Sequence, residues 1–504
     1  MKTPYYITTP IYYVNDKPHI GHAYTTIAAD VIARFKRMDG FDVMFLTGTD
    51  EHGQKVNKSA EIAGVDPQIF VDRVSQNFKD LMPVLNVTPD RFIRTTEAEH
   101  KKAAQDIWNR LIASGDIYLG SYEGWYSVRD EAFYSESELV EGNAPTGAPV
   151  EWVEEPSYFF RLSKWQEPLL TFYEEHPNFI APHSRRNEVI RFVEGGLMDL
   201  SVSRTSFNWG VHVPGDERHV MYVWLDALTN YLTGVGFPDI KCEAYQKYWP
   251  ADLHLMGKDI IRFHAVYWPA FLMAAGLEPP KRVFAHGWWT NEGQKISKSL
   301  GNVIDPIELI HQYGADAFRY VLLREVSFGQ DGDFSITAMR NRINSDLANA
   351  YGNLVQRVLS FVYKQCDGML HASDIKEPQD KAVLQGLETA LVEARVAIDH
   401  QALHKVCDAI WQCIYDANAY VDNEKPWSLR KENPERMQTV LYVLCNVIKR
   451  LALLTFPILP QASEIILRLL GEVGFDFSNF NILLPDQRCI NEPFPVFPRI
   501  EEIV

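Results

Sequence analysis

The chain has 504 residues, and its 49 Lys and Arg against 66 Asp and Glu give a formal net charge of −17 at pH 7. Such a length indicates about three domains rather than one. Hydrophobic residues make up 46% and charged residues 23%, which excludes disordered and fibrous classes. The acidic balance argues against a protein that coats nucleic acid indiscriminately, but it is compatible with one RNA partner bound through a local basic surface.

The cysteines, the N-terminus and the apolar stretches point to the same compartment. None of the six cysteines forms a CxxC pair, so we expect neither a disulfide framework nor a cysteine zinc site. The first residues lack the apolar core of a signal peptide. The longest apolar stretch, 440–459, contains Asn446, Lys449 and Arg450, which predicts a buried helix rather than a membrane span. We therefore expect a cytoplasmic protein without a membrane partner.

The N-terminal residues follow the pattern of a nucleotide-binding α/β unit. Residues 5–9 predict a short strand that ends at Pro10. Residues 23–38 predict a helix, and residues 42–46 a second strand. Strand, helix and strand in this order form a βαβ unit with parallel strands. A capping box at 96–99 predicts a further helix that reaches about residue 114.

The composition changes between residues 120 and 165, where aromatic residues, Gly and Pro are frequent. This composition predicts a small β-rich insertion. A strand of the main sheet is predicted near 219–225, a helical segment after Gly257, and another strand near 282–286. Beyond about residue 340, apolar residues recur at helical spacing, which predicts a helix bundle.

The segment Pro-His-Ile-Gly-His at residues 18–22 follows the first strand and begins the helix. A helix N-terminus offers unpaired N–H groups and partial positive charge, so phosphates bind there. Gly21 leaves room for a nucleotide against the backbone, and His19 and His22 can donate hydrogen bonds to phosphoryl oxygens. Histidines beside Gly are also ordinary turn residues, so this segment alone does not decide between the two interpretations.

The segment Lys-Ile-Ser-Lys-Ser at residues 295–299 lies between two glycines. Its lysines and hydroxyls suit a mobile clamp on a polyphosphate. Taken alone, it is better explained as a basic surface loop. Together and in this order, however, the two segments are typical of class I aminoacyl-tRNA synthetases.

The chain resembles the methionyl-tRNA synthetase family along essentially its full length. The matching stretches in the α/β part are Pro-Ile-Tyr-Tyr-Val-Asn at 10–15, Thr-Gly-Thr-Asp-Glu-His-Gly at 47–53, Tyr-Val-Trp-Leu-Asp-Ala-Leu at 222–228, Met-Gly-Lys-Asp at 256–259 and Phe-His at 263–264. Those in the helical part are Asn-Leu-Val-Gln-Arg at 353–357 and Asn-Glu-Lys-Pro-Trp at 423–427.

The resemblance implies an α/β fold, namely a Rossmann-like class I synthetase catalytic domain with a small β-rich insertion, followed by an all-α anticodon-binding helix bundle. The expected boundaries are 1–117 and 216–285 for the two halves of the catalytic domain, 118–215 for the inserted connective-peptide domain, 286–340 for the Lys-Ile-Ser-Lys-Ser loop and linking region, and 341–504 for the anticodon-binding domain.

The resemblance also implies the activity of a methionine–tRNA ligase. ATP and L-methionine would form methionyl-adenylate with release of pyrophosphate, and the methionyl group would then pass to the 3′ end of tRNA(Met), initiator tRNA included. Such chemistry depends on positioning and charge stabilisation rather than on a protein nucleophile.

The family's ATP site can be carried over residue by residue. By this resemblance ATP contacts His19, Gly21, His22, Gly257, Lys258, Asp259, Lys295, Ser297 and Lys298. Of these, the residues expected to act in catalysis are His19, Gly21, His22, Lys295 and Lys298. An ion pair of Lys258 and Asp259 within the domain is an equally good interpretation. Mg²⁺ would accompany the polyphosphate, held mostly by substrate oxygens and water.

In the methionine site implied by the family, Asp50 pairs with the α-ammonium group, although an Asp before a Gly-containing loop also commonly caps a turn or helix. The thioether would be enclosed by Ile11, Tyr13, Trp224, Ala227, Leu228, Tyr231, Ile260 and His264. One methylene in an apolar pocket is worth roughly 1–3 kcal/mol, so homocysteine should compete. Since the chain has no room for a large editing domain, we expect any correction within the synthetic site.

Asn353, Arg357 and Trp427 match the family's anticodon-reading positions. Single-stranded bases are read by stacking on aromatic rings and by hydrogen bonds to their exposed edges. Trp427 follows Pro426, so we expect it at the start of a helix. A core aromatic is the alternative interpretation of this residue.

The chain departs from the family in two places. Many members carry a zinc knuckle of CxxC pairs in the insertion, whereas residues 126–130 and 143–147 contain no cysteine, so we expect no structural zinc and no other protein-held metal. The chain also ends at Val504 without the extra tRNA-binding domain that dimerises some relatives, and we therefore expect a monomer.

Four other interpretations compete. A synthetase for another apolar amino acid would carry an editing insertion, and a cysteine-specific synthetase would need zinc ligands. A small-molecule nucleotidyltransferase of the same fold would not need the helical half. A tRNA-binding regulator without activity would not be expected to keep Asp50 and both phosphate-binding segments intact.

Overall fold

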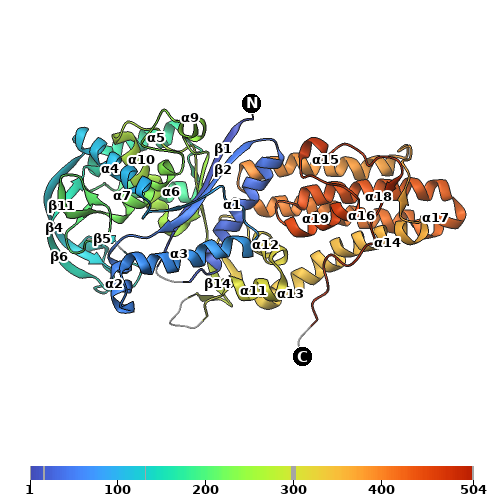
Figure 1. Cartoon of the computed structure of the whole chain (residues 1–504), viewed down its shortest axis with the longest axis horizontal. Coiled ribbons are helices and arrows are strands. Elements are labelled where there is room, and N and C mark those ends of the chain that lie inside the picture. Colours follow the sequence, from blue (N-terminus) through green and yellow to red (C-terminus); the bar gives the residue numbers. More distant parts are fainter. Residues whose placement is uncertain (1, 15–16, 131, 297–301, 502–504) are drawn as a thin grey trace.

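The computed structural model describes residues 2–14, 17–130, 132–296 and 302–501, and it is elongated, with an α/β half joined to a helical half (Figure 1). A central sheet of six parallel strands holds the α/β half together in the order β3-β2-β1-β12-β13-β7. Its strands are β1 (Pro4–Tyr13), β2 (Asp42–Asp50), β3 (Arg91–Arg94), β7 (Ile180–Ala181), β12 (Leu253–Gly257) and β13 (Val283–His286). The strand order reverses at β1, and ligands bind at the carboxyl ends of parallel strands at such a point.

β1 is longer than the strand predicted for residues 5–9, because it continues through Pro10 to Tyr13. Its register against β2 shifts between Thr8 and Ile11. The amide that Pro10 lacks therefore falls where the ladder of hydrogen bonds is interrupted, which is where a strand tolerates proline. As a result, Ile11 and Tyr13 reach the carboxyl edge of the sheet.

The βαβ unit predicted at the N-terminus is confirmed, with α1 (Ile20–Met38) as the crossover between β1 and β2. The predicted capping box at 96–99 is wrong. α4 (Ala98–Ala113) has Glu97 as its N-cap and no side-chain cap. The hydroxyl of Thr96 donates to the carboxylate of Glu51 instead, because that acceptor from the loop after β2 lies within reach.

The predicted β-rich insertion is confirmed as an antiparallel sheet in the order β5-β4-β6-β8. Its strands are β4 (Ile117–Ser127), β5 (Ala132–Tyr134), β6 (Glu151–Phe160) and β8 (Leu200–Ser201). Between β6 and β8 the chain forms α5 (Gln166–Glu175), β7 and α6 (His183–Glu194). β7 belongs to the central sheet, so the range 118–215 supplies an edge strand to the catalytic core as well as the insertion.

The strand of the main sheet predicted near 219–225 is wrong. β11 (Asp216–Met221) pairs with β9 (Ser203–Arg204) and β10 (His212–Val213) in a separate small sheet. The chain then turns at Tyr222 into the short helix α7 (Val223–Leu228), because the amides of Leu225 and Asp226 bond to the Tyr222 carbonyl. The bulky apolar residues of this stretch thus line a helix face rather than a strand.

The remaining elements of the α/β half surround the sheet. They are α2 (Gln54–Ala63), α3 (Pro67–Val84), α8 (Asn230–Thr233), α9 (Glu243–Tyr248), α10 (Trp268–Ala274), β14 (Trp289–Asn291), β15 (Gln294–Lys295), β16 (Gly332–Phe334), α11 (Pro306–Tyr313) and α12 (Ala315–Arg324). α10 and β13 confirm the helical segment predicted after Gly257 and the strand predicted near 282–286.

The helix bundle predicted beyond residue 340 is confirmed. It consists of α13 (Ile336–Arg342), a π-helix (Ile343–Gly352), α14 (Asn353–Gln365), α15 (Pro378–Asp399), α16 (Leu403–Glu424), α17 (Pro426–Glu432), α18 (Pro434–Thr455) and α19 (Pro460–Leu469). The short strands β17 (Met369–Leu370) and β18 (Arg488–Cys489) pair with each other beside it. α18 has the length and hydropathy of a membrane-crossing helix, but 89% of its most apolar window is buried in the bundle.

α12 joins the two halves through Arg319, whose side chain is fully buried. The guanidinium donates to four carbonyl oxygens and one carboxylate, those of Leu85 (3.1 Å), Asn86 (3.1 Å), Pro457 (2.8 Å), Ile458 (3.0 Å) and Asp30 Oδ2 (2.7 Å). The carbonyls follow the last residues of α3 and α18, where helices leave acceptors unpaired and carry partial negative charge. One cation therefore caps two helices that belong to different halves of the molecule.

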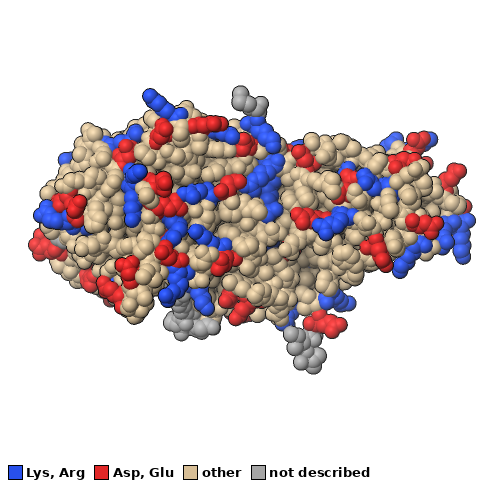
Figure 2. All heavy atoms as spheres, viewed as in Figure 1, with Lys and Arg blue, Asp and Glu red and all other residues tan. Residues whose placement is uncertain are grey.

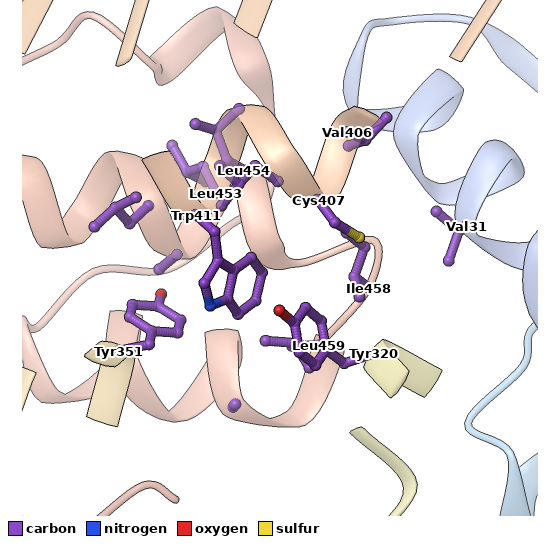
Figure 3. Close-up of a cluster of buried hydrophobic side chains, with 14 of the residues drawn as sticks. Val31, Tyr320, Tyr351, Val406, Cys407, Trp411, Leu453, Leu454, Ile458 and Leu459 are labelled. Carbon is purple, nitrogen blue, oxygen red and sulfur yellow. The ribbon is translucent and has the colours of Figure 1, made fainter. Parts of the chain in front are cut away.

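Apolar side chains beside Arg319 extend this interface between the two halves. Trp411 of α16 stacks on Tyr320 of α12, with ring centroids 4.1 Å apart, and Tyr351 lies on its other side (Figure 3). Val31 of α1 belongs to the same buried cluster (Figure 3). Because the cluster draws on both halves, the catalytic and helical parts share one continuous core.

Arg319→Met should lower the free energy of unfolding by about 3–5 kcal/mol, because the carbonyls of Leu85, Pro457 and Ile458 lose the guanidinium that donates to them and the buried carboxylate of Asp30 loses one of its two cationic partners. Chemical denaturation followed by circular dichroism measures this loss. Arg324→Met is the matched control on the same helix, since Arg324 pairs with Asp408 at the surface, and it should cost at most about 1 kcal/mol. Equal losses in the two variants would contradict the role given to Arg319.

Asp316, also on α12, accepts hydrogen bonds from the amides of Ala462 (2.7 Å) and Gln461 (3.4 Å) at the start of α19. Burial raises the pKa of its carboxyl from 3.8 to about 6. The folded state therefore binds this proton more tightly than the unfolded chain, and the stability that this provides is lost as the pH rises from about 4 through about 6.

Asp316→Asn keeps an acceptor oxygen and cannot ionise, so it should gain about 1–3 kcal/mol relative to the parent between pH 4 and pH 7. Denaturation curves of both proteins at several pH values measure this difference. A constant difference across the range would show that Asp316 has an ordinary pKa.

Candidate functional site

A cleft of ≈ 1010 Å³ opens at the carboxyl edge of the central sheet, where the strand order reverses. Its walls come from the ends of β1 and β2, the first turn of α1, the helices α7 and α8, the segment after β12, and residues within 286–296 and 303–308. A large concave site at such a switch point is the usual place for ligands in open α/β sheets.

The two histidines of residues 18–22 cap α1 with their own side chains. His19 Nδ1 accepts from the Gly21 amide at 3.0 Å, and His22 Nδ1 accepts from the His19 amide at 3.1 Å. An accepting Nδ1 carries no proton, so in the neutral ring the proton is on Nε2. Burial lowers the pKa of both rings, that of His22 well below its usual value. Both histidines are therefore neutral near pH 7, and each keeps one N–H donor.

Three further residues of the predicted ATP site lie on the described segment after β12. Gly257 and Asp259 line the cleft, and Asp259 Oδ1 accepts from Trp288 Nε1 at 3.1 Å. Lys258 does not line the cleft, because its ammonium is paired with Asp331 at 2.6 Å and lies over the Trp288 ring. The ion-pair interpretation of Lys258 is thus supported, although its partner is Asp331 rather than Asp259.

The Lys-Ile-Ser-Lys-Ser segment is described only in part. Lys295 is the last residue of β15, whereas Ser297 and Lys298 lie outside the described residues. Ile296, between them, lines the cleft. The described part of this segment therefore borders the same cavity as the first turn of α1.

All nine residues predicted to bind methionine line the cleft. They are Ile11, Tyr13, Asp50, Trp224, Ala227, Leu228, Tyr231, Ile260 and His264. Asp50 ends β2 and is 6% exposed. Trp224 stacks on Phe263 with ring centroids 3.7 Å apart and planes 7° from parallel, which fixes one wall.

The tautomer of His264 follows from its two partners. His264 Nδ1 lies 3.0 Å from the Ile260 carbonyl, which can only accept, so Nδ1 donates. Burial lowers the pKa of His264 to about 4, so the ring is neutral near pH 7 and its Nε2 accepts from the Tyr231 hydroxyl at 2.7 Å. In the apolar part of this wall, the polar groups of Tyr231 and His264 therefore bind each other, and the His264 ring carries no charge.

Several cleft residues were missed by the sequence analysis. Arg129, Asp130 and Thr146 reach the cleft from the insertion, and Lys17, Lys55 and Asn230 line it from the catalytic core. No motif marks them. Only the position of Lys17 beside the 18–22 segment, and of Lys55 beside the 47–53 segment, was a signal that could have found them.

Arg129 and Thr146 belong to residues 126–130 and 143–147, the two stretches in which no zinc knuckle was expected. Arg129 Nη2 donates to the Thr146 carbonyl at 2.9 Å, and the Thr146 hydroxyl donates to Asp130. Hydrogen bonds thus connect the two stretches. Within the described residues, no three His, Cys, Asp or Glu side chains come together as a metal site, and the absence of structural zinc stays a prediction.

A second, smaller cavity of ≈ 140 Å³ lies at the outer end of the helical half. It is lined by Arg357, Val358, Phe361, Val421, Pro426, Trp427 and Leu441. Trp427 is 45% exposed at the start of α17, as predicted, and the Arg357 guanidinium lies 5.3 Å from the centre of its ring. Asn353 is exposed one turn before Arg357 on the same face of α14.

Charges of both signs lie around this cavity, since the Arg357 guanidinium pairs with Asp422 at 2.9 Å. Lys and Arg side chains lie at the outer end of the helical half, over α17 and its surroundings, with Asp and Glu side chains beside them (Figure 2). α17 itself carries Arg430 and Lys431 in its last turn. The whole visible face mixes both signs (Figure 2), so the basic side chains near the cavity are interspersed with acidic ones.

Two family models match the chain. The model described as tRNA synthetases class I (M) matches residues 5–151 and 146–359. The model described as the anticodon binding domain of methionyl tRNA ligase matches residues 371–482. Together they cover both halves and both cavities.

Curated relatives match over almost the whole chain. A methionine–tRNA ligase of Rickettsia felis is 56% identical over 510 residues, 99% of each chain. That of Brucella suis is 53% identical over 507 residues, 99% of this chain and 98% of its own. The solved Mycobacterium tuberculosis methionyl-tRNA synthetase in complex with methionyl-adenylate is 53% identical, with a TM-score of 0.97 over 99% of this chain and 100% of its own.

Proposed function

The chain belongs to the methionyl-tRNA synthetase family of class I tRNA synthetases, and we propose that the cleft at the carboxyl edge of its central sheet is where it activates methionine. The enzyme ligates L-methionine to tRNA in two steps. A methionine carboxylate oxygen bonds to the α-phosphorus of ATP as pyrophosphate leaves. A ribose hydroxyl at the 3′ end of the tRNA then attacks the carbonyl carbon, and AMP leaves.

One observation carries this assignment. The described side chains of the expected ATP and methionine sites come from five separate segments, and all but Lys258 line the same cleft at the switch point. The solved relative whose title names methionyl-adenylate has the same fold throughout, which supports one cavity for both substrates.

At the methionine end, the Asp50 carboxylate would pair with the α-ammonium group, since it is the buried anion that lines the slot. The thioether would lie among Trp224, Tyr231 and the neutral His264. Contacts of sulfur with aromatic rings favour it by about 0.3–1.5 kcal/mol each. Homocysteine would make the same contacts. Discrimination against it therefore has to come from the second step, the transfer to tRNA, or from reaction of the activated homocysteine within this site.

At the ATP end, His19 and His22 would donate from Nε2 to phosphoryl oxygens at the positive end of α1. Asp259, held by Trp288, would accept from the ribose. Lys295, Ser297 and Lys298 would clamp the polyphosphate. Mg²⁺ would neutralise charge on the phosphates; no described group of three carboxylates or histidines could hold it alone, so phosphate oxygens and water would be its main ligands.

The helical half would select the tRNA. Asn353, Arg357 and Trp427 lie on or beside the small cavity of α14 and α17, where an unstacked anticodon base would find an aromatic face and hydrogen-bond donors. We propose that the partner is tRNA(Met), initiator tRNA included, and that the enzyme acts as a cytoplasmic monomer.

Asp50→Asn should reduce kcat/KM for methionine in ATP–pyrophosphate exchange by about 10²-fold, because the ammonium loses a charged, desolvated partner. The loss should appear in KM for methionine while KM for ATP stays unchanged. Asp486→Asn, at an exposed position of the helical half, is the control. Unaltered methionine kinetics in Asp50→Asn would show that the carboxylate has only a structural role.

Trp427→Ala should raise KM for tRNA in aminoacylation by about 10-fold or more, since stacking on one base is worth about 1–3 kcal/mol. Pyrophosphate exchange without tRNA should be unaffected. Tyr363→Ala removes an exposed aromatic from α14 outside the cavity and should change neither assay. If Trp427→Ala aminoacylates like the parent, the small cavity is not where the base binds.

A further inference from the structure

Behind the methionine slot lies a buried carboxylate that binds two imidazoles from two other elements. Asp226 Oδ2 lies 2.6 Å from His52 Nδ1, and Asp226 Oδ1 lies 2.7 Å from His100 Nε2. All three side chains are at most 2% exposed. His100 Nδ1 contacts the Thr233 hydroxyl at 3.1 Å, which ties the group to α8 as well. We call Asp226, His52 and His100 the carboxylate clamp.

Asp226 lies on the side of α7 that faces away from the slot, and this helix has little stability of its own. α7 has only six residues and no side-chain cap, and helices this short depend on tertiary contacts. Trp224, Ala227 and Leu228 share the face that lines the cleft, whereas Asp226 points to the other side. Asp226 is also the single ionisable residue of this helix, so its two bonds orient the wall of the slot.

The other end of the clamp holds the loop that follows Asp50. His52 is two residues beyond Asp50, and its carbonyl accepts from the Tyr13 hydroxyl at 3.2 Å. The Trp209 indole donates to the Glu51 carbonyl at 2.6 Å and meets the His52 ring edge-on at 5.5 Å. The residue that would bind the ammonium group therefore begins a loop whose imidazole is fixed by Asp226.

The carboxylate of the clamp is ionised. Burial opposes its ionisation, but the adjacent imidazoles of His52 and His100 outweigh this effect and hold the pKa of Asp226 well below its usual range. Each imidazole consequently donates to a full negative charge, which makes such hydrogen bonds roughly twice as strong as neutral ones.

We propose that Asp226 is a positioning residue for methionine, which sets the distance between the α7 wall and the Asp50 carboxylate through His52 and His100. This inference rests on the proposed role of Asp50. It adds that the α7 wall beside the thioether and the Asp50 carboxylate that binds the ammonium group move together as one rigid unit, separate from the ATP end of the cleft.

A double-mutant cycle in pyrophosphate exchange tests the proposal, with Asp226→Asn, Asp50→Asn and the double variant. Asp226→Asn should raise KM for methionine about 10-fold and change KM for ATP less than about twofold. In the Asp50→Asn background, the same substitution should lower kcat/KM for methionine by less than about threefold, because the anchor that it positions is already lost.

Two further variants keep the test decisive. His100→Gln removes one donor and leaves Asp226 in place, so it should raise KM for methionine by a smaller factor in a protein that folds. Asp380→Asn is the matched control, since Asp380 is an equally buried carboxylate that accepts from Tyr420 (2.6 Å) and Arg436 (2.7 Å) in the helical half. It should leave both KM values unchanged.

The outcomes separate the two hypotheses. No loss in Asp50→Asn alone would overturn the proposed anchor, whatever Asp226 does. A loss in Asp50→Asn combined with fully additive effects in the double variant would overturn only the clamp. Equal increases in KM for methionine and ATP, or an Asp380→Asn effect as large as that of Asp226→Asn, would show that Asp226 acts through general stability.

Discussion

The arrangement of the whole molecule depends on the burial of one guanidinium. Taking a cation such as Arg319 out of water costs several kcal/mol, and the cost is offset only when every donor finds a well-placed acceptor. Arg319 meets this condition with carbonyls at the ends of α3 and α18 and the carboxylate of Asp30. Because these groups belong to both halves, the halves cannot separate without exposing a charge and two uncapped helix ends.

The contact between Arg319 and Asp30 also connects the interface between the two halves to the cleft. Asp30, which binds Arg319, lies in the middle of α1, and the first turn of α1 carries His19 and Gly21 at the cleft. A helix is stiff over such a length, so the position of the helical half and the position of the first turn of α1 are coupled through one element. A tRNA bound at the outer end through Trp427, as proposed, would thereby be presented to a cleft whose orientation is fixed.

Much of the fold was predictable because local patterns and tertiary structure agree there. The βαβ unit and the helix bundle follow from periodicity, and the family motifs identified nine residues that line one cleft, where methionine binding stays a proposal. The failures have tertiary causes. Pro10 continues a strand because the ladder is interrupted beside it, and residues 223–228 form a helix because Tyr222 accepts from two following amides.

The parts of the site that no sequence pattern could identify are those assembled from distant segments. Arg129 and Thr146 reach the cleft only because the insertion folds over it, and Lys258 leaves the cleft because Asp331 lies within reach. Asp226 stands inside a recognised motif, yet its role depends on His52 and His100, which lie 174 and 126 residues away in the chain.

The protonation of the two capping histidines has a consequence for how the cleft works. A neutral N–H donor adds little to the binding of ATP before reaction, whereas it gains most from charge that grows on phosphate oxygens as the bond to pyrophosphate breaks. His19 and His22 are suited to stabilising this growing charge. Their Nδ1 atoms already accept hydrogen bonds that cap α1, so only the Nε2–H donor remains. In the proposed site, affinity for ATP would then come from the helix end, the lysines and Mg²⁺, which would leave the histidines free to favour the transition state.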